Sequence, residues 1–269
     1  MNINVRKVFA DKNPALARRL PGFFYRWLER TIHQEEMNYF LDISANKTGI
    51  AFLDEAIAYF DLHIQTIGLE HIANDRRYIF ASNHPLGGLD GIVLINILSK
   101  KFGNIKAPVN DILMNIENIK EFFIPINKHG KQDRASAIET EEIYKSDKQV
   151  LTFPAGLCSR KIKGKIVDLQ WKKNFITKAI QYKRDIVPVY FDGKNSDFFY
   201  NLSNLRKKIG VKANIEMLYL PDEMFKQKGK ELNIYFGKPI SYETFDKSKT
   251  PEQWADFVKS IVYQSKNII

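Results

Sequence analysis

The sequence contains a single cysteine, Cys158, among its 269 residues. One cysteine cannot pair within the chain, so a disulfide-stabilised scaffold is excluded and a free thiol in a cytoplasmic protein is expected. The sequence also lacks the apolar runs of roughly 20 residues that membrane-spanning helices need. No apolar segment follows the charged start of the chain, which argues against a secretory signal. We therefore expect a protein without disulfides, signal peptide or transmembrane span.

Several signatures of catalytic and metal sites are missing as well. The chain has no Gly-x-Ser-x-Gly elbow, no Walker loop and no Gly-x-Gly-x-x-Gly fingerprint. Its five histidines do not show metal-ligand spacing. We therefore expect neither a metal ion nor a resident cofactor.

Positive charge and aromatic side chains are abundant. The chain has 41 Lys and Arg against 31 Asp and Glu, a net charge of +10, and it contains 19 Phe, 12 Tyr and 3 Trp. A hydrophobic fraction of 44% allows a packed core, which excludes a disordered chain. The charge indicates an anionic partner, and nucleic acid, an anionic membrane surface and an acidic carrier protein all fit it.

From residue 51 onward, helical patterns alternate with runs typical of strands. We expect strands at 63–69, 78–82, 104–109, 122–126, 149–153, 186–191 and 232–237, and helices at 51–62, 91–101, 111–120, 133–147, 171–185 and 251–264. This alternation predicts an α/β fold with a mainly parallel central sheet flanked by helices on both faces. We assign residues 61–269 to this domain.

Residues 1–60 are predicted to form an N-terminal helical segment, whose most amphipathic stretch is residues 21–43. Phe23, Phe24 and Trp27 recur there near helical spacing, and Arg18, Arg19, Arg26 and Arg30 lie among or beside them. Two interpretations are open. The apolar stripe can pack on the domain, or it can lie in a membrane interface with the aromatics in lipid and the arginines at the headgroups.

A histidine and an aspartate follow the expected strand at 78–82, in the run Asn83-His84-Pro85-Leu86-Gly87-Gly88-Leu89-Asp90. In open α/β sheets such loops at the carboxyl ends of strands carry the reactive groups. Histidine can act as a general base near neutral pH, and a carboxylate can orient it. On a regular helix the two side chains would point about 120° apart. They meet only through a turn, which Gly87 and Gly88 permit.

This run resembles the Asn-His-x4-Asp motif of the glycerolipid acyltransferases, the lysophosphatidic-acid acyltransferase superfamily. Three further blocks, at residues 123–128, 153–160 and 187–189, follow in that family's order, and the resemblance covers roughly residues 64–240. Five residues instead of four separate His84 from Asp90, and Ala155 replaces the usual acidic residue. In both features the sequence resembles a bacterial subgroup of haemolysin-like acyltransferases. That subgroup looks close to the enzymes that O-acylate lyso-ornithine or lyso-glycine lipids.

The resemblance implies a peripheral O-acyltransferase at the cytoplasmic face of the inner membrane. It would move a fatty acyl group from a coenzyme A or acyl carrier protein thioester to the hydroxyl of a lysolipid, and it would bind an anionic membrane surface. His84 would be the general base and Asp90 its orienting partner. The remaining residues expected to bind substrate are Asn83, Gly87, Gly88, Lys128, Gly156, Ser159 and Arg160. Amides near the glycines would stabilise the oxyanion, and Lys128, Ser159 and Arg160 would hold anionic groups.

Two alternatives belong to other functional classes. A basic protein could bind anionic lipid or nucleic acid without chemistry, although no nucleic acid is expected because a recognisable pattern of stacking aromatics and basic residues is missing. Alternatively, Cys158 could be a nucleophile with His84 as its base, which would give a thioesterase. A lone cysteine next to a strand end is more often simply small and buried.

Overall fold

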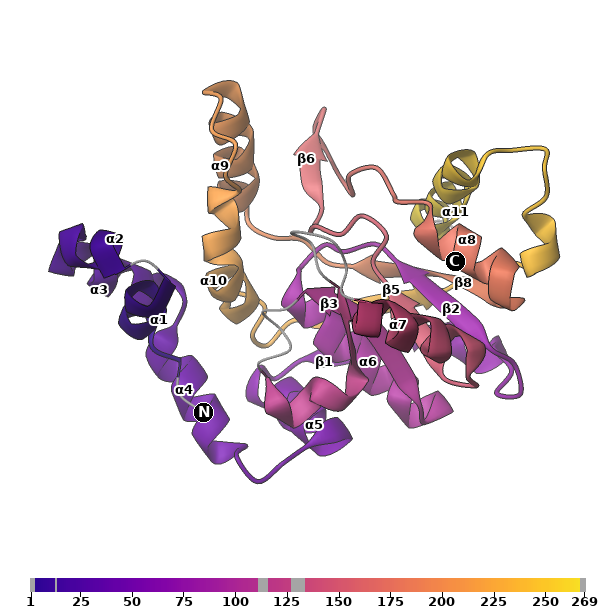
Figure 1. Ribbon diagram of the computed structural model, residues 1–269, viewed down its shortest axis with the longest axis horizontal. Coiled ribbons are helices and arrows are strands. Elements are labelled where there is room, and N and C mark those ends of the chain that lie inside the picture. Colours follow the sequence, from indigo (N-terminus) through magenta and orange to yellow (C-terminus); the bar gives the residue numbers. More distant parts are fainter. Residues whose placement is uncertain (1–2, 13, 111–115, 127–133, 267–269) are drawn as a thin grey trace.

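The computed structural model describes residues 3–12, 14–110, 116–126 and 134–266, and a seven-stranded sheet lies at its centre (Figure 1). The strand order is β1-β9-β8-β2-β5-β3-β4. Within this sheet the β8–β9 pair is antiparallel and the other neighbours are parallel. The prediction of a mainly parallel sheet is therefore confirmed. The strands are β1 (His63–Ile67), β2 (Tyr78–Ser82), β3 (Ile105–Asn110), β4 (Phe123–Ile126), β5 (Gln149–Thr152), β8 (Asp185–Asp192) and β9 (Glu231–Phe236).

Helices cover both faces of the sheet, as the sequence predicts. Phe80 of β2 belongs to a core with α5 (Gly49–Tyr59) and α6 (Gly88–Phe102). Its neighbour Ile79 belongs to a second core with α7 (Arg134–Lys145), α8 (Asn174–Tyr182) and α11 (Pro251–Ser265). Successive strand residues face opposite sides, so a central strand between two cores is buried on both of its faces. All five residues of β2 are accordingly buried.

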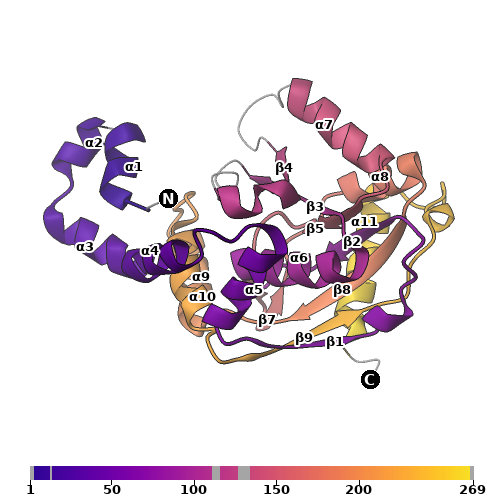
Figure 2. The same cartoon turned by 90° about the horizontal axis from the view of Figure 1, so that it is seen from below.

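The N-terminal helices form an arm beside the sheet (Figures 1 and 2). They are α1 (Val5–Lys12), α2 (Pro14–Arg19), α3 (Gly22–Thr31) and α4 (Gln34–Ile43). The helical character of this region is confirmed, but the amphipathic stretch is two helices instead of one, because His33 between them adopts a left-handed φ of 52°. Val5, Tyr25 and Leu28 form a small core of the arm itself.

Some elements differ from the expectation. Of the helix expected at 111–120, residues 111–115 lie outside the described part of the chain, and Glu117–Phe122 forms the short 3-10 helix η3. The sequence patterns did not indicate α9 (Asp197–Lys208), η4 (Ile215–Tyr219), α10 (Leu220–Phe225) or the hairpin of β6 (Arg160–Ile162) and β7 (Lys165–Val167). Helices α9 and α10 stand between the arm and the sheet (Figures 1 and 2). Among the described helices, none is both long and apolar enough to cross a bilayer.

Candidate active site

The turn after β2 brings His84 and Asp90 together. Nδ1 of His84 lies 3.0 Å from Oδ2 of Asp90. The Asp90 side chain is completely buried, whereas that of His84 is 19% exposed. Solvent or a substrate can therefore reach the imidazole but not the carboxylate.

Asp90 is held at the start of α6, where it is the third helical residue. Its carboxylate accepts the backbone N–H groups of Leu86 at 3.0 Å and Gly87 at 3.2 Å. Burial raises the pKa of the Asp90 carboxyl above its usual value, while the hydrogen bonds from His84 and from the two amides oppose the rise. The Asp90 carboxylate accepts a hydrogen bond from the Nδ1–H group of His84, so Nε2 is the nitrogen left to take a proton from a substrate.

Gly87 allows the turn that closes this pair. Its φ is 81°, a backbone conformation that side chains disfavour. A Cβ at this position would also lie 3.2 Å from Cδ1 of Leu220 in α10. At Gly88 an added Cβ would meet nothing within 4 Å. The two glycines that the sequence singles out thus differ: the turn requires Gly87.

The loop that follows β5 lies against the His84 loop, because β2 and β5 are neighbours in the sheet. The His84 ring stacks on Phe153, with a centroid separation of 4.2 Å. The backbone N–H of Ser159 donates to the carbonyl of His84 at 2.8 Å. The two runs at residues 83–90 and 153–160, which both resemble acyltransferase motifs, are therefore in direct contact.

Asp168 is a buried residue that links these two loops, and the sequence did not single it out. Its Oδ1 accepts the backbone N–H of His84 at 3.2 Å and the hydroxyl of Ser159 at 2.5 Å. Its Oδ2 accepts the indole N–H of Trp171 at 2.9 Å. Asp168 therefore positions the backbone of the proposed base. Its link to His84 spans 84 residues, so no local pattern could have indicated it.

Asn83 joins the same loop to the end of β8. Its side-chain N–H donates to the carbonyl of Phe191 at 3.0 Å, and its Oδ1 accepts the Phe191 N–H at 2.6 Å. Asn195 adds a second link, since its amide N–H donates to the carbonyl of Pro85 at 3.1 Å. The amide of Asn83, expected from the sequence to bind substrate, is thus used within the protein.

The expected anion-binding residues have different surroundings. Lys128 lies outside the described residues. Arg160 is buried, and its guanidinium donates to the Cys158 carbonyl at 2.6 Å and to Glu216 at 2.9 Å. The Ser159 hydroxyl is bonded to Asp168. Gly156 has a φ of 68°, and its N–H donates to the Phe153 carbonyl at 2.9 Å. The structure thus places Ser159 beside the His84 loop and pairs Arg160 internally.

Cys158 is buried and accepts a hydrogen bond from Arg160 at 3.1 Å. Burial raises the pKa of the Cys158 thiol, although the nearby Arg160 charge opposes this. A nucleophilic cysteine needs an accessible thiolate, so these surroundings disfavour the covalent route. Across the described ranges, no group of three or more His, Cys, Asp or Glu residues is arranged to hold a metal ion.

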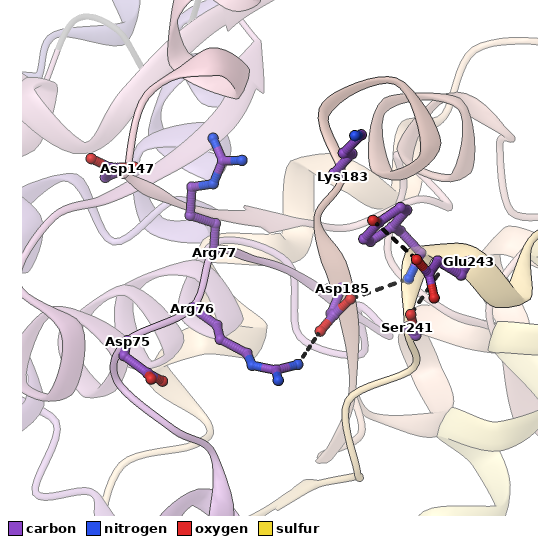
Figure 3. Close-up of a pocket in the computed structure, with 9 residues that line it drawn as sticks. Asp75, Arg76, Arg77, Asp147, Lys183, Asp185, Ser241 and Glu243 are labelled. Atoms are coloured by element: carbon purple, nitrogen blue, oxygen red, sulfur yellow. Dashed lines mark hydrogen bonds and ion pairs between the residues drawn. The ribbon is translucent and has the colours of Figure 1, made fainter.

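A surface hollow of about 440 Å³ lies at the other edge of the sheet (Figure 3). Its lining includes Arg76, Arg77 and Asp185, which precede or begin β2 and β8. His84 follows the opposite end of β2, so this hollow is separate from the His84 site. Arg76 and Asp185 pair across it at 3.2 Å.

A comparison with protein-family models agrees with this fold and with the loops gathered at one edge of the sheet. The chain matches the model described as "Acyltransferase" over residues 7–269. It therefore belongs to this acyltransferase family, and the prediction that it is an O-acyltransferase is confirmed. A purely binding role is correspondingly disfavoured.

Two similar proteins carry a more specific name. The chain is 48% identical to the lyso-glycine lipid O-acyltransferase of Bacteroides thetaiotaomicron, over 97% of each chain. It is 46% identical to the protein of the same name from Phocaeicola vulgatus, over 97% of this chain and 94% of that one. Both names refer to glycine lipid and not to ornithine lipid.

A solved structure supports the fold. The crystal structure of the 1-acyl-sn-glycerophosphate acyltransferase PlsC from Thermotoga maritima matches with a TM-score of 0.52, covering 81% of this chain and 78% of that one. The sequences are 16% identical, so this likeness concerns the architecture alone.

Proposed function

We propose that this enzyme transfers a fatty acyl group from a thioester of coenzyme A or acyl carrier protein to the hydroxyl of a lyso-glycine lipid. The acceptor is inferred from the two relatives, whose identity of 48% and 46% extends over nearly the whole chain. The mechanism is inferred from one observation, the 3.0 Å contact between a partly exposed His84 and the buried Asp90.

In the proposed reaction, Nε2 of His84 removes the proton of the acceptor hydroxyl while its oxygen attacks the thioester carbon. The carbon–sulfur bond then breaks, and the leaving thiol takes up the proton from the imidazolium. Asp90 stabilises the imidazolium and keeps the ring oriented. General-base assistance of this kind contributes about 10²–10⁴ in rate.

The oxyanion of the tetrahedral intermediate needs a nearby donor. The amides of Gly87 and Gly156 donate to Asp90 and Phe153. The amide of Gly88, the first residue of α6, is therefore the favoured donor among the three glycines. A helix N-terminus is also a favourable site for negative charge.

We further propose that α3 binds the protein peripherally to the cytoplasmic face of an anionic membrane. Phe23 is 68% exposed and Trp27 39% exposed, and the side chains of Arg26 and Arg30 on the same helix are exposed as well. Phe24 instead packs against Phe9 and Tyr25 within the arm. Exposed aromatics beside arginines are typical of an interfacial helix.

The mechanism is tested with purified His84→Ala and Asp90→Asn proteins. Acyl transfer to lyso-glycine lipid is measured with acyl-coenzyme A and with acyl carrier protein as donors. We expect the rate of His84→Ala to fall about 10²–10⁴-fold, with the fold retained as judged by circular dichroism. Asp90→Asn should also lose activity, because an amide cannot stabilise the imidazolium.

His71→Ala is the matched control, because His71 is an exposed histidine that follows β1, three strands away from β2 in the sheet. Near-wild-type turnover of His84→Ala would contradict the mechanism. Preference for lysophosphatidate over lyso-glycine lipid would contradict the proposed acceptor while leaving the mechanism intact.

A further inference from the structure

Helix α9 exposes an apolar stripe along its length. Phe198, Leu202 and Leu205 of α9 and Ile209 just after it are spaced by four, three and four residues, which places them within about 60° of one another around a helix. Leu205 is 55% exposed and Ile209 is 65% exposed. Exposed apolar side chains gathered on one face mark an interaction site more often than isolated ones do.

This stripe is not the side by which α9 packs on the protein. Phe199, Ser203 and Arg206 are buried on another side of the helix. Arg206 pairs there with Glu216 of η4, which also pairs with Arg160 of β6. The helix is therefore anchored by one face and presents the other outward.

The exposed apolar surface continues beyond α9 and reaches the arm. Val211, Ile215 and Leu218 extend it through the following loop and η4. Tyr219 then contacts Phe198 of α9 at 4.9 Å and Trp27 of α3 at 6.1 Å between ring centroids. We call the α9 surface the exposed residues Phe198, Leu205, Ile209, Val211, Ile215 and Leu218 together with the half-buried Leu202.

Basic side chains lie near the α9 surface. Lys207, Lys208 and Lys212 are exposed at the end of α9 and in the loop that follows it. The neighbouring β6–β7 hairpin, joined to α9 by the Asn204 amide and the Lys161 carbonyl at 3.2 Å, adds exposed Lys163 and Lys165. The exposed carboxylate at the start of α9, Asp197, is paired with Lys161 at 2.8 Å. This rim is complementary to an anionic surface.

We propose that the α9 surface is a second contact with the anionic phospholipid bilayer, beside the α3 contact on which this inference partly rests. A bilayer fits better than an acidic carrier protein, because the large apolar side chains spread over two elements and join the exposed aromatics of α3. Helix α9 follows β8 and the hairpin follows β5, both at the sheet edge where the His84 loop follows β2. Two contacts would therefore turn the His84 edge toward the lipid.

The proposal can be tested with an environment-sensitive dye on single cysteines. Because the natural Cys158 is buried, the dye reacts selectively with cysteines introduced as Ile209→Cys on α9 or Phe23→Cys on α3. The matched control is Ile180→Cys on α8, where the native side chain is 42% exposed. Vesicles of phosphatidylglycerol and phosphatidylcholine should shift the emission of the Ile209 and Phe23 labels to the blue and leave the Ile180 label unchanged.

A binding measurement accompanies the dye. The Leu205→Ser, Ile209→Ser double variant should partition onto these vesicles at least about tenfold more weakly, because two side chains no longer enter the apolar layer. Ile180→Ser should bind like the wild type.

Several outcomes would overturn the proposal. A shift of the Phe23 label without one at Ile209 would limit membrane contact to α3. A shift at Ile209 with acyl carrier protein but not with vesicles would make the α9 surface a donor-docking site. Turnover of lyso-glycine lipid in detergent micelles is measured on the same proteins. Turnover in micelles tests the proposed acyl transfer without a bilayer. A failure of the proposed reaction is therefore distinguished from a failure of the proposed membrane contact.

Discussion

Gly87 is the residue whose backbone makes the His84–Asp90 contact possible. Its positive φ strains any side chain placed there, and a Cβ would also press against Leu220. We expect Gly87→Ala to lower the free energy of unfolding by about 1–3 kcal/mol and to reduce acyl transfer, since the turn must open. Urea unfolding and turnover measure the two effects.

Gly91→Ala is the matched control for this substitution. Gly91 lies in α6, and a Cβ there would meet nothing within 4 Å. Alanine is favoured over glycine in a helix by roughly 1 kcal/mol, so this variant should be at least as stable as the wild type. Equal stability of the two variants would show that Gly87 is not required by the turn.

The sequence predicted the contact between His84 and Asp90 better than the partners that support it. His84, Asp90 and the two glycines lie within one short run, so a local pattern could indicate that they meet. Arg160 shows the limit of such patterns. Its partner Glu216 lies 56 residues away, and the sequence did not indicate that the guanidinium would be paired internally.

At the scale of elements, Glu216 joins η4 to both α9 and β6. Burial acts to raise the pKa of Glu216, but hydrogen bonding to Arg206 and the charges of Arg160 and Arg206 outweigh it, so the pKa is lowered from 4.5. The folded state therefore binds this proton less readily than the unfolded chain does. The stabilisation is present above about pH 4.5 and is lost as pH falls through the lower folded pKa.

We expect Glu216→Gln to lower stability at neutral pH by about 3–5 kcal/mol, because two buried arginines lose their anion. The variant should also lose less further stability on acidification than the wild type. Unfolding free energies measured from about pH 7 to about pH 3 check both points.

Glu117→Gln is the control for this variant, since Glu117 pairs with Lys120 on the surface. Glu117→Gln should match the wild type in its stability at neutral pH and in the stability it loses on acidification. An unchanged acid dependence of Glu216→Gln would contradict the role assigned to this carboxylate.

At the scale of the whole molecule, the net charge of +10 and the arm act together in the proposed membrane binding. We expect the Phe23→Ser, Trp27→Ser double variant to float less with anionic vesicles, because these exposed rings no longer enter the lipid. Raising the salt concentration should weaken flotation of the wild type, since exposed charges are screened.

Phe24→Ser provides the contrast for this prediction. Phe24 packs on Phe9 and Tyr25, so its loss should lower the thermal stability of the arm, whereas Phe23→Ser alone should melt like the wild type because Phe23 is 68% exposed. Unchanged flotation of the double variant would return α3 to a packing role.

The sequence by itself determined the layered sheet and the edge that carries the site. Strand-forming and helix-forming runs alternate along the chain, and the carboxyl ends of neighbouring parallel strands meet at one edge. The loops after β2 and β5 were therefore expected at that edge, although only the structure shows that the two strands are neighbours. The glycine-containing turn could bring His84 to Asp90.

The tertiary structure alone decided what surrounds this pair. The hydrogen bonds of Asp168, the pairing of Arg160 with Glu216 and the left-handed break at His33 have no local signal, because each depends on packing or on partners distant in sequence. The exposed face of α9 has no local signal either, because apolar residues occupy two sides of this helix. Only its docking through Phe199 and Arg206 shows which of these sides remains exposed.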